Sequence, residues 1–329
     1  MAPAGPAANE AAGLRIVHCF RSPVGGIFRH VRDLVEAQVA QGASVGIVCD
    51  SSTGGEHEEA MFDEVQPLLE LGLFRVPMQR QVSPTDLTAL LRLLRQMRAV
   101  RPDVIHAHGA KGGVYGRTIG TLLRLTGSRV RRLYCPHGGS LHYDAQKASG
   151  RAFFRIERWL ETMTDALVFV SRYESNAYQA KVGTPHRPFR IASNGVRPEE
   201  FETLATAPDA ADFLYIGMMR DLKGPDLFLA ALARLGEASG AAPSALMVGD
   251  GPDLDRYRDM ARTLGIDSTT RFLPAMPARQ AFSLARVVVV PSRAESMPYI
   301  VLEAAAAARP LVATNVGGIP EIFGEQHDR

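Results

Sequence analysis

One pattern recurs along the chain: a short apolar run, a polar or glycine-containing loop, and a segment with apolar residues at helical spacing. Short β-branched runs bounded by turn residues are typical of buried strands. We expect such strands at 14–19, 44–50, 103–109, 129–135 and 166–171. Strands that alternate with helices predict a parallel sheet with right-handed crossovers, which is the doubly wound class of α/β fold.

The Gly/Ser stretch after the second of these strands is predicted to be a loop, and a helix further along is predicted to end before Pro102. Its apolar positions are Leu87, Leu90, Leu91, Leu94 and Met97. The same helix carries Arg92, Arg95 and Arg98. We interpret it either as a basic amphipathic helix that touches an anionic membrane or as a crossover helix with a solvated face.

The pattern restarts after Asn194-Gly195-Val196 and a connecting segment, 197–211. Further strand-and-loop units are expected at 213–217, 245–251, 271–275, 287–292 and 310–315. We therefore predict two Rossmann-like domains, residues 14–196 and 212–329, behind a flexible tail at 1–13. Ligands of such sheets bind at the carboxyl ends of strands, so the cleft between the domains is the expected site. The second domain looks incomplete, because another pair of helices should follow residue 321.

The stretch 291–311 follows a β-branched run and is expected to form a loop and then a helix that Pro298 opens as its first residue. Backbone N–H groups at a helix start bind anions. Glu295 and Glu303 lie on either side of this start, where they would repel an anion but accept hydrogen bonds from hydroxyls. A phosphate beside hydroxyls describes a nucleotide sugar.

Composition indicates the compartment of the protein and the charge of its partners. The 329 residues include three cysteines, Cys19, Cys49 and Cys135, all in strand-like runs, which indicates buried thiols in a reducing, cytoplasmic setting. No apolar run approaches the length of about 18 residues that spans a bilayer. Residues 1–195 carry 24 Lys/Arg against 17 Asp/Glu, and residues 196–329 carry 13 against 18, so the two halves suit different partners.

Several loop residues in the first half have two interpretations, one functional and one purely structural. Gly25 and Gly26 follow the first strand and allow a ligand close to the backbone, or form a simple tight turn. His137 lies in a glycine-rich loop and either donates a hydrogen bond to a substrate hydroxyl or is a solvent-exposed turn residue. His106 and His108 are expected on opposite faces of their strand, and no Cys or Asp pattern around them indicates a metal site.

Loop residues in the second half suggest a diphosphate. Arg220 and Lys223 follow a strand, where two cations would stabilise the charge that grows on a departing diphosphate, although both are also ordinary loop residues. Gly249 lies in the sequence Gly-Asp-Gly-Pro, which either approaches a base or ribose or is simply a turn.

These motifs, taken in order over residues 14–321, resemble the retaining glycosyltransferases of family 4, which have the GT-B two-domain fold. The motifs are Gly25-Gly26, Asn194-Gly195-Val196, Gly217 with Lys223-Gly224, Gly249-Asp250-Gly251-Pro252, Glu295 with Glu303, and Gly317-Gly318-Ile319-Pro320-Glu321. The resemblance implies a hexosyltransferase that binds a nucleotide-sugar donor in its C-terminal domain and an acceptor in its N-terminal domain. It implies no bound metal and no other cofactor.

The resemblance also assigns roles to residues. Glu303 is expected to bind the donor ribose, Glu295 the sugar hydroxyls, and Lys223 the phosphate. The backbone of residues 296–298 (Ser296, Met297 and Pro298), Gly249 and the Gly25-Gly26 loop should also face the donor. His137 is expected near the 6-position of the sugar. The family has an arginine where this chain has Met218, so either Arg220 supplies the guanidinium or the arginine contribution is absent.

The implied function is sugar transfer with retention of configuration, in cell-surface polysaccharide or lipopolysaccharide assembly. The basic N-terminal half suits a glycan or lipid-linked acceptor and peripheral contact with the inner membrane surface; nothing in the pattern indicates nucleic acid. Two alternatives remain open. One is a nucleotide-sugar epimerase of the same architecture, and the other is a catalytically silent scaffold with this fold.

Overall fold

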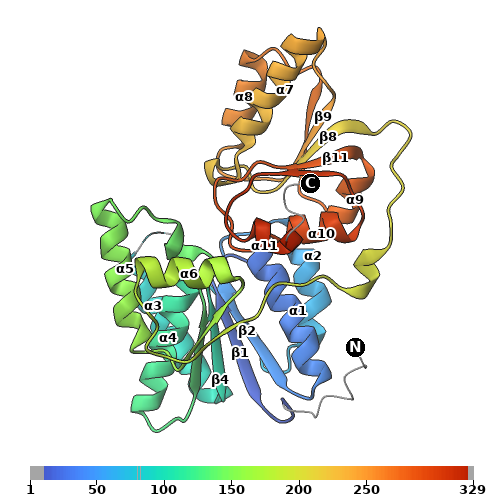
Figure 1. Ribbon diagram of the computed structural model, residues 1–329. Coiled ribbons are helices and arrows are strands. Elements are labelled where there is room, and N and C mark those ends of the chain that lie inside the picture. Colours follow the sequence, from blue (N-terminus) through green and yellow to red (C-terminus); the bar gives the residue numbers. More distant parts are fainter. Residues whose placement is uncertain (1–10, 80, 82, 325–329) are drawn as a thin grey trace. The chain divides into compact units, whose positions relative to one another are not determined.

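The computed structural model describes residues 11–324 except 80 and 82, and the chain divides into two compact units, Met1–Ala192 and Ser193–Arg329 (Figure 1). Each unit holds one sheet whose described strands all pair in parallel. The predicted α/β fold with two doubly wound units is thus confirmed. Of the expected tail, residues 1–10 lie outside the described residues, whereas Ala11 is buried and Gly13 donates its N–H to Gly42 O.

The first sheet has the strand order β3-β2-β1-β4-β5-β6-β7. The strands are β1 (Arg15–Phe20), β2 (Ser44–Asp50), β3 (Gly72–Val76), β4 (Val104–His108), β5 (Arg131–Cys135), β6 (Ala166–Phe169) and β7 (Phe189–Ile191). Successive strands are added outward in both directions from β1, so the order reverses between β1 and β4. In folds of this class the loops that follow two such strands part at the carboxyl edge and leave room for side chains from both.

Helices cover both faces of this sheet. Helices α1 (Gly26–Ala40) and α2 (Glu56–Val65) pack on one face, and α3 (Thr85–Val100) and α4 (Gly109–Leu125) pack on the other. Helices α5 (Ala148–Glu161) and α6 (Arg172–Lys181) follow, with short 3₁₀ turns η1 (Gln66–Leu68) and η2 (Gly139–His142). The apolar side of each helix lies on alternate strand residues, as the period of two along a strand requires.

Two strands and a helix escaped the sequence prediction. The Gly/Ser stretch at 51–55 is a loop as expected, but α2 begins directly after it at Glu56 and β3 follows, and neither element was predicted. Glu58 caps the start of α2 by accepting the Gly55 N–H at 2.8 Å, and the buried residues Phe62 and Val65 pack on the sheet. Strand β7 is only three residues long and all three residues are exposed, so it offers no buried apolar run to detect.

The second sheet has the order β10-β9-β8-β11-β12. Its strands are β8 (Ala211–Ile216), β9 (Ala245–Val248), β10 (Thr270–Leu273), β11 (Ala285–Val290) and β12 (Leu311–Ala313). Helices α7 (Pro225–Ser239) and α8 (Leu254–Thr263) pack on one face, and α9 (Ala278–Ser283) and α10 (Tyr299–Ala306) on the other (Figure 1). Shorter elements are η3 (Pro198–Phe201), η4 (Asp221–Lys223) and α11 (Ile319–Phe323).

A fully buried ion pair joins α4 to α5 in the first unit. The Arg117 side chain is 0% exposed, and its Nη1 lies 2.6 Å from Glu157 Oε1. Its guanidinium also lies over the Tyr134 ring, 3.7 Å from the centroid. Gly113 makes room for this stack, since a Cβ there would come within 2.5 Å of the ring. If either residue were replaced by an uncharged one, the charge of the other would remain in a low-dielectric interior without a counter-ion, which would destabilise the unit.

Removing one partner of this pair should destabilise the first unit strongly. We expect Arg117→Met to lower the free energy of unfolding by about 3–5 kcal/mol, because Glu157 would stay buried without its counter-ion. Adding Glu157→Leu to that variant should restore part of the loss. Urea unfolding followed by circular dichroism measures both, with the exposed ion-pair residue Arg258→Met as the control. Equal stability of the Arg117 and Arg258 variants would contradict the assignment.

Candidate functional site

In the second unit, the loops after β8 and β11 touch at the carboxyl edge of the sheet. Gly224 ends η4 with φ 69°, and a Cβ there would lie 2.1 Å from the carbonyl oxygen of Pro291. Only glycine accepts this conformation and this approach together. The backbone N–H of Arg293 also donates to Leu222 O at 2.9 Å. The two loops are therefore fixed against each other by their main chains.

Lys223 and Glu295 meet across this junction. Lys223 Nζ lies 2.6 Å from Glu295 Oε1, and Ser292 Oγ donates to the same oxygen at 2.7 Å. The Glu295 side chain is 8% exposed, whereas the Lys223 side chain is 33% exposed. The structure thus joins two residues to which the sequence analysis gave separate roles. The buried carboxylate holds the ammonium group at the surface of the loop, where an anion can reach it.

Arg293 is a residue that sequence reasoning missed. Its guanidinium binds both carboxylate oxygens of Asp226 on α7, at 2.8 and 2.6 Å, and donates to Asp221 O at 2.6 Å. This two-pronged geometry clamps the loop after β11 onto η4 and the start of α7. The sequence around Arg293 did not predict this contact, because Asp226 lies 67 residues away.

The rest of the loop after β11 is braced from three sides. Gly317 has φ 63°, and a Cβ there would lie 1.7 Å from Glu295 O. Thr314 Oγ1 donates to Ser292 O at 2.6 Å, and Asn194 Nδ2 donates to Met297 O at 2.8 Å. The glycine-rich motif predicted from the sequence at 317–318 therefore supports the loop by close packing.

Helix α10 begins at Tyr299, so Pro298 is its N-cap and not its first residue as predicted. Pro298 has ψ 126°, which is extended, and no side chain among the described residues caps the first turn. Ser296, Met297 and Pro298 are buried just ahead of the helix. Glu303 lies half-buried in the second turn. Both glutamates of the motif thus lie near one helix start, and their donor-binding roles stay predictions.

The loop after β9 also contacts the loop after β8. A Cβ on Gly249, which has φ 137°, would lie 2.1 Å from Gly217 O, and Met219 N donates to Asp250 O at 2.9 Å. Gly249 is thus required by packing between loops, whether or not a ligand approaches it. Arg220 is the N-cap of η4, in the same loop as Lys223.

In the first unit, Gly25 and Gly26 start α1. Gly25 is the N-cap with φ 71°, a conformation that favours glycine, and a Cβ there would have no neighbour within 4 Å. Both glycines are exposed. Exposed backbone at the start of a 15-residue helix can bind an anion, and the role of these glycines in donor binding stays a prediction.

His137 ends a chain of hydrogen-bonded side chains. Its Nε2 lies 3.0 Å from His108 Nδ1, His108 Nε2 lies 3.0 Å from His18 Nδ1, and His18 Nε2 lies 2.9 Å from Gln38 Oε1. The ring of His30 on α1 packs edge-on against His137, with centroids 4.7 Å apart. His137 has φ 49°, an uncommon conformation for a residue other than glycine.

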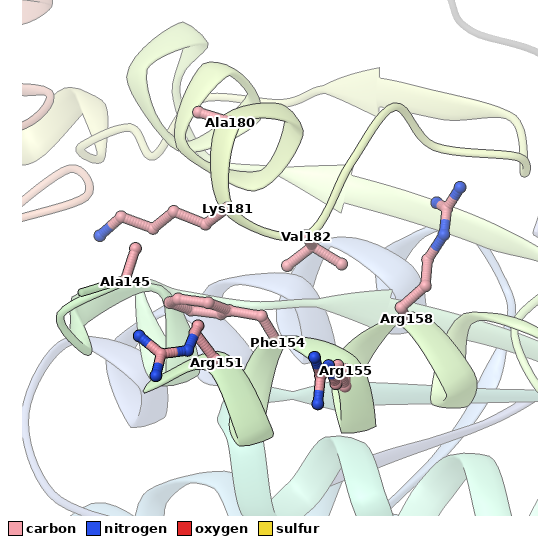
Figure 2. Close-up of a pocket in the computed structure, with 8 residues that line it drawn as sticks. All are labelled: Ala145, Arg151, Phe154, Arg155, Arg158, Ala180, Lys181 and Val182. Atoms are coloured by element: carbon pink, nitrogen blue, oxygen red, sulfur yellow. The ribbon is translucent and has the colours of Figure 1, made fainter. Parts of the chain in front are cut away.

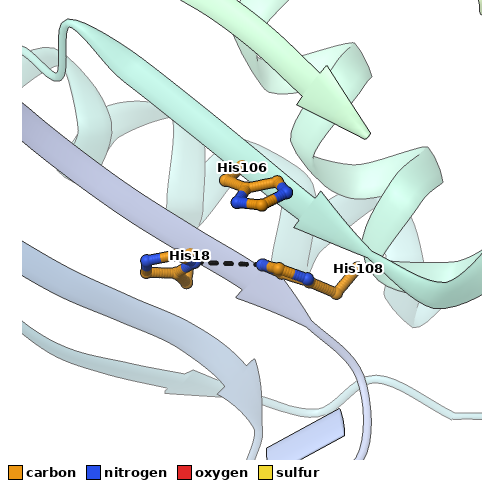
Figure 3. Close-up of side chains that lie close together, drawn as sticks. All are labelled: His18, His106 and His108. Carbon is orange, nitrogen blue, oxygen red and sulfur yellow. Dashed lines mark hydrogen bonds between the residues drawn. The ribbon is translucent and has the colours of Figure 1, made fainter. Parts of the chain in front are cut away.

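The expectation that His106 and His108 point to opposite faces is wrong. Their rings lie 4.1 Å apart, and His18 on β1 pairs in register with His106 (Figure 3). Residues two apart in a strand point the same way, so both face α1. The nitrogens of His18, His106 and His108 lie within 4.8 Å of one another, and so do those of His30, His108 and His137. Either trio has a geometry that can hold a metal ion, so the prediction of no metal stays a prediction.

Desolvation dominates the titration of these histidines. Burial lowers the pKa of His18 from 6.5 to about 4, and it lowers the pKa of His106, His108 and His137 well below the usual value. Neighbouring imidazoles lower the pKa of each further by charge repulsion. All four rings are therefore neutral near pH 7.

Acid should weaken the first unit in a defined pH window. Between pH 6.5 and about 4 the unfolded chain binds a proton at His18 and the folded chain does not, so the free energy of unfolding falls as pH falls, by roughly 3 kcal/mol for this group. Urea unfolding from pH 7 to 4.5 measures the slope. His18→Gln should reduce it and the exposed His186→Gln should not. Identical slopes in all three proteins would contradict the burial effect.

A separate cavity of about 340 Å³ opens in the first unit between α5 and the end of α6 (Figure 2). Its lining includes four cationic side chains, Arg151, Arg155, Arg158 and Lys181. Arg158 pairs with Glu161 at 2.9 Å, while Arg155 makes no ion pair with any described residue. None of the residues predicted from the motifs lines this cavity.

Comparison with known proteins identifies the family. Residues 24–200 match the model of Glycosyltransferase Family 4, and residues 196–329 match the model of glycosyl transferases group 1. The chain is 26% identical to glycogen synthase of Mycobacterium tuberculosis over 318 residues, which cover 91% of this chain and 76% of that relative.

Solved structures agree in fold. Sucrose-phosphate synthase from Thermosynechococcus elongatus superposes with a TM-score of 0.70 at 21% identity, covering 93% of this chain and 82% of that one. WaaG, a glycosyltransferase involved in lipopolysaccharide biosynthesis, gives 0.70 at 16% identity, covering 95% and 84%. With one family model matching more than half of its length, the chain belongs to Glycosyltransferase Family 4 and is an enzyme of the glycosyltransferase class with the GT-B fold.

Proposed function

We propose that the chain transfers a hexosyl group from a nucleotide-diphosphate sugar to a glycan or lipid-linked acceptor with retention of configuration. The observation that carries this proposal is the pairing of Lys223 with Glu295 beside the start of α10. A cation, a carboxylate and a helix start without a side-chain cap lie together on loops held rigid by Gly224 and Arg293. Phosphate and hydroxyl groups on one ligand match that set of partners.

In the proposed complex, the donor diphosphate binds Lys223 in place of Glu295. Its oxygens attract the ammonium group away from Glu295, and the carboxylate is then available to accept hydrogen bonds from sugar hydroxyls. Ser292 keeps the carboxylate in place during the exchange, since its hydroxyl donates to the same oxygen. As the sugar–phosphate bond breaks, charge grows on the diphosphate, where Lys223 and Arg220 stabilise it.

Retention follows from front-side attack by the acceptor. Once Lys223 has moved to the diphosphate, Glu295 still accepts from Ser292 and is occupied by the sugar hydroxyls, so it is poorly placed to act as a nucleophile. Glu303 binds the ribose. No metal is required, because the cations and the helix start supply the positive charge. No observation favours the epimerase or the silent scaffold.

Two substitutions separate donor binding from catalysis. Glu303→Ala should raise the donor KM, because ribose contacts are equal in ground and transition states. Lys223→Ala should lower kcat about 10²–10³-fold, since it removes charge stabilisation that develops with bond breaking. A thermal-shift screen of UDP-glucose, ADP-glucose and GDP-mannose first selects the donor. Exposed Glu237→Ala on α7 is the control, and unchanged kinetics in both site variants would refute the assignments.

We further propose a role at the inner membrane surface, in polysaccharide or lipopolysaccharide assembly. WaaG, by its description, acts in lipopolysaccharide biosynthesis, and it shares this fold. Helix α5 carries exposed Phe153, Ile156 and Trp159, which are 39%, 49% and 59% exposed, beside the cationic cavity. Apolar and basic side chains together suit the interface of an anionic membrane. None of the helices that the structure describes is long and apolar enough to cross a membrane.

Charge placed on α5 tests this membrane contact. Trp159→Glu combined with Ile156→Glu should abolish sedimentation with vesicles of phosphatidylglycerol and phosphatidylethanolamine, because acidic groups are repelled by the anionic surface. Leu235→Glu on α7, which changes a leucine that is 46% exposed in the other unit, should leave sedimentation unchanged. Binding that persists in the α5 double variant would place the contact elsewhere, with α3 the next candidate.

A further inference from the structure

The histidines of the first unit form a hydrogen-bonded series with a direction. Gln38 on α1, His18 on β1 and His108 on β4 lead in sequence to His137 in the loop after β5. Figure 3 shows the central link, where the rings of His18 and His108 face each other from neighbouring strands. Both rings are 0% exposed, so water does not compete for these bonds.

The chemistry of Gln38 sets the direction. Its Oε1 can only accept, so the His18 nitrogen that it faces, Nε2, must carry the hydrogen. A neutral imidazole has one N–H, so His18 Nδ1 is an acceptor and His108 Nε2 donates to it. By the same argument His108 Nδ1 accepts, and His137 Nε2 donates to it.

We propose that Gln38, His18 and His108 are positioning residues that hold His137 in the tautomer with hydrogen on Nε2. The Nδ1 of His137 is then left without hydrogen and accepts from a substrate hydroxyl, which reverses the donor role expected from the sequence. The substrate part of this inference rests on the proposed function, whereas the tautomer does not. The loop is held for this task, since Gly138 N donates to Glu174 Oε1 at 2.5 Å.

A bound metal ion is the competing account of the same cluster. His18, His106 and His108 have suitable nitrogens, and His106 Nε2 has no hydrogen-bond partner among the described residues. Two features argue against it. Neither trio contains a carboxylate or a thiolate to offset the two positive charges of a buried divalent ion. In addition, His18 Nδ1 and His108 Nε2 lie 3.0 Å apart and already form a hydrogen bond. Metal binding is therefore an outcome to be tested.

The tautomers are read directly by two-bond ¹H–¹⁵N correlation spectra of ¹⁵N-histidine-labelled protein at pH 7.5. We expect His18, His108 and His137 all to carry hydrogen on Nε2. Gln38→Met has a similar shape but cannot accept a hydrogen bond, so His137 should become a mixture of tautomers. Gln38→Glu keeps an acceptor and should preserve the wild-type pattern. His106→Gln, a buried change on the same face but outside the series, should also leave His137 unchanged.

Several results would overturn the proposal. One is a wild-type His137 with hydrogen on Nδ1, and another is a Gln38→Met spectrum in which the folded His137 is unaltered. Titration with Zn²⁺ covers the competing account. Saturable binding that removes the hydrogen shared by His18 and His108, and that is lost in His106→Gln, would establish a metal site instead. These readouts need no donor or acceptor, so they can fail independently of the proposed function.

Kinetics then tests the link to catalysis. With the donor identified by thermal shift, Gln38→Met should lower kcat/KM about 10-fold, in the range typical of partners that orient a functional histidine. Gln38→Glu should restore it. A Gln38→Met enzyme with mixed tautomers and unchanged kcat/KM would confine the series to a structural role.

Discussion

The contact of Gly224 with the Pro291 carbonyl is the constraint on which the second unit's site depends. Strands β8 and β11 are neighbours in a parallel sheet, so their following loops emerge side by side. A Cβ at residue 224 would lie 2.1 Å from Pro291 O, so any side chain there would force these loops apart. Because they touch, Lys223 and Glu295 reach each other although 72 residues separate them. The ion pair is a product of sheet order, not of local sequence.

The first unit uses the same sheet geometry for a different chemistry. Strands β1 and β4 lie side by side at the point where the strand order reverses, and they bring His18 and His108 together. The second unit thus offers a cation and a carboxylate, and the first offers neutral imidazoles. A charged donor and hydroxyl-bearing groups call for these two kinds of partner, which is consistent with a transferase that handles two substrates.

Sequence patterns predicted the fold because buried parallel strands are continuous apolar runs. The apolar run before Pro291 predicted β11, whereas β7 is short and exposed and was not predicted. The site was predictable only as a set of residue types. The Lys223–Glu295 pair, the Arg293 clamp and the histidine series all join residues from different strands or loops. The prediction that His106 and His108 lie on opposite faces was wrong because residues two apart along a strand point to the same face.

The central claim is that a diphosphate displaces Lys223 from Glu295. Calorimetry with UDP, ADP and GDP, each against its nucleoside monophosphate, tests it most directly. The account predicts that the matching diphosphate binds wild-type protein at least about tenfold more tightly than its monophosphate, which is about 1.4 kcal/mol. It also predicts that this difference disappears in Lys223→Met. Equal preference for the diphosphate in both proteins would contradict the account.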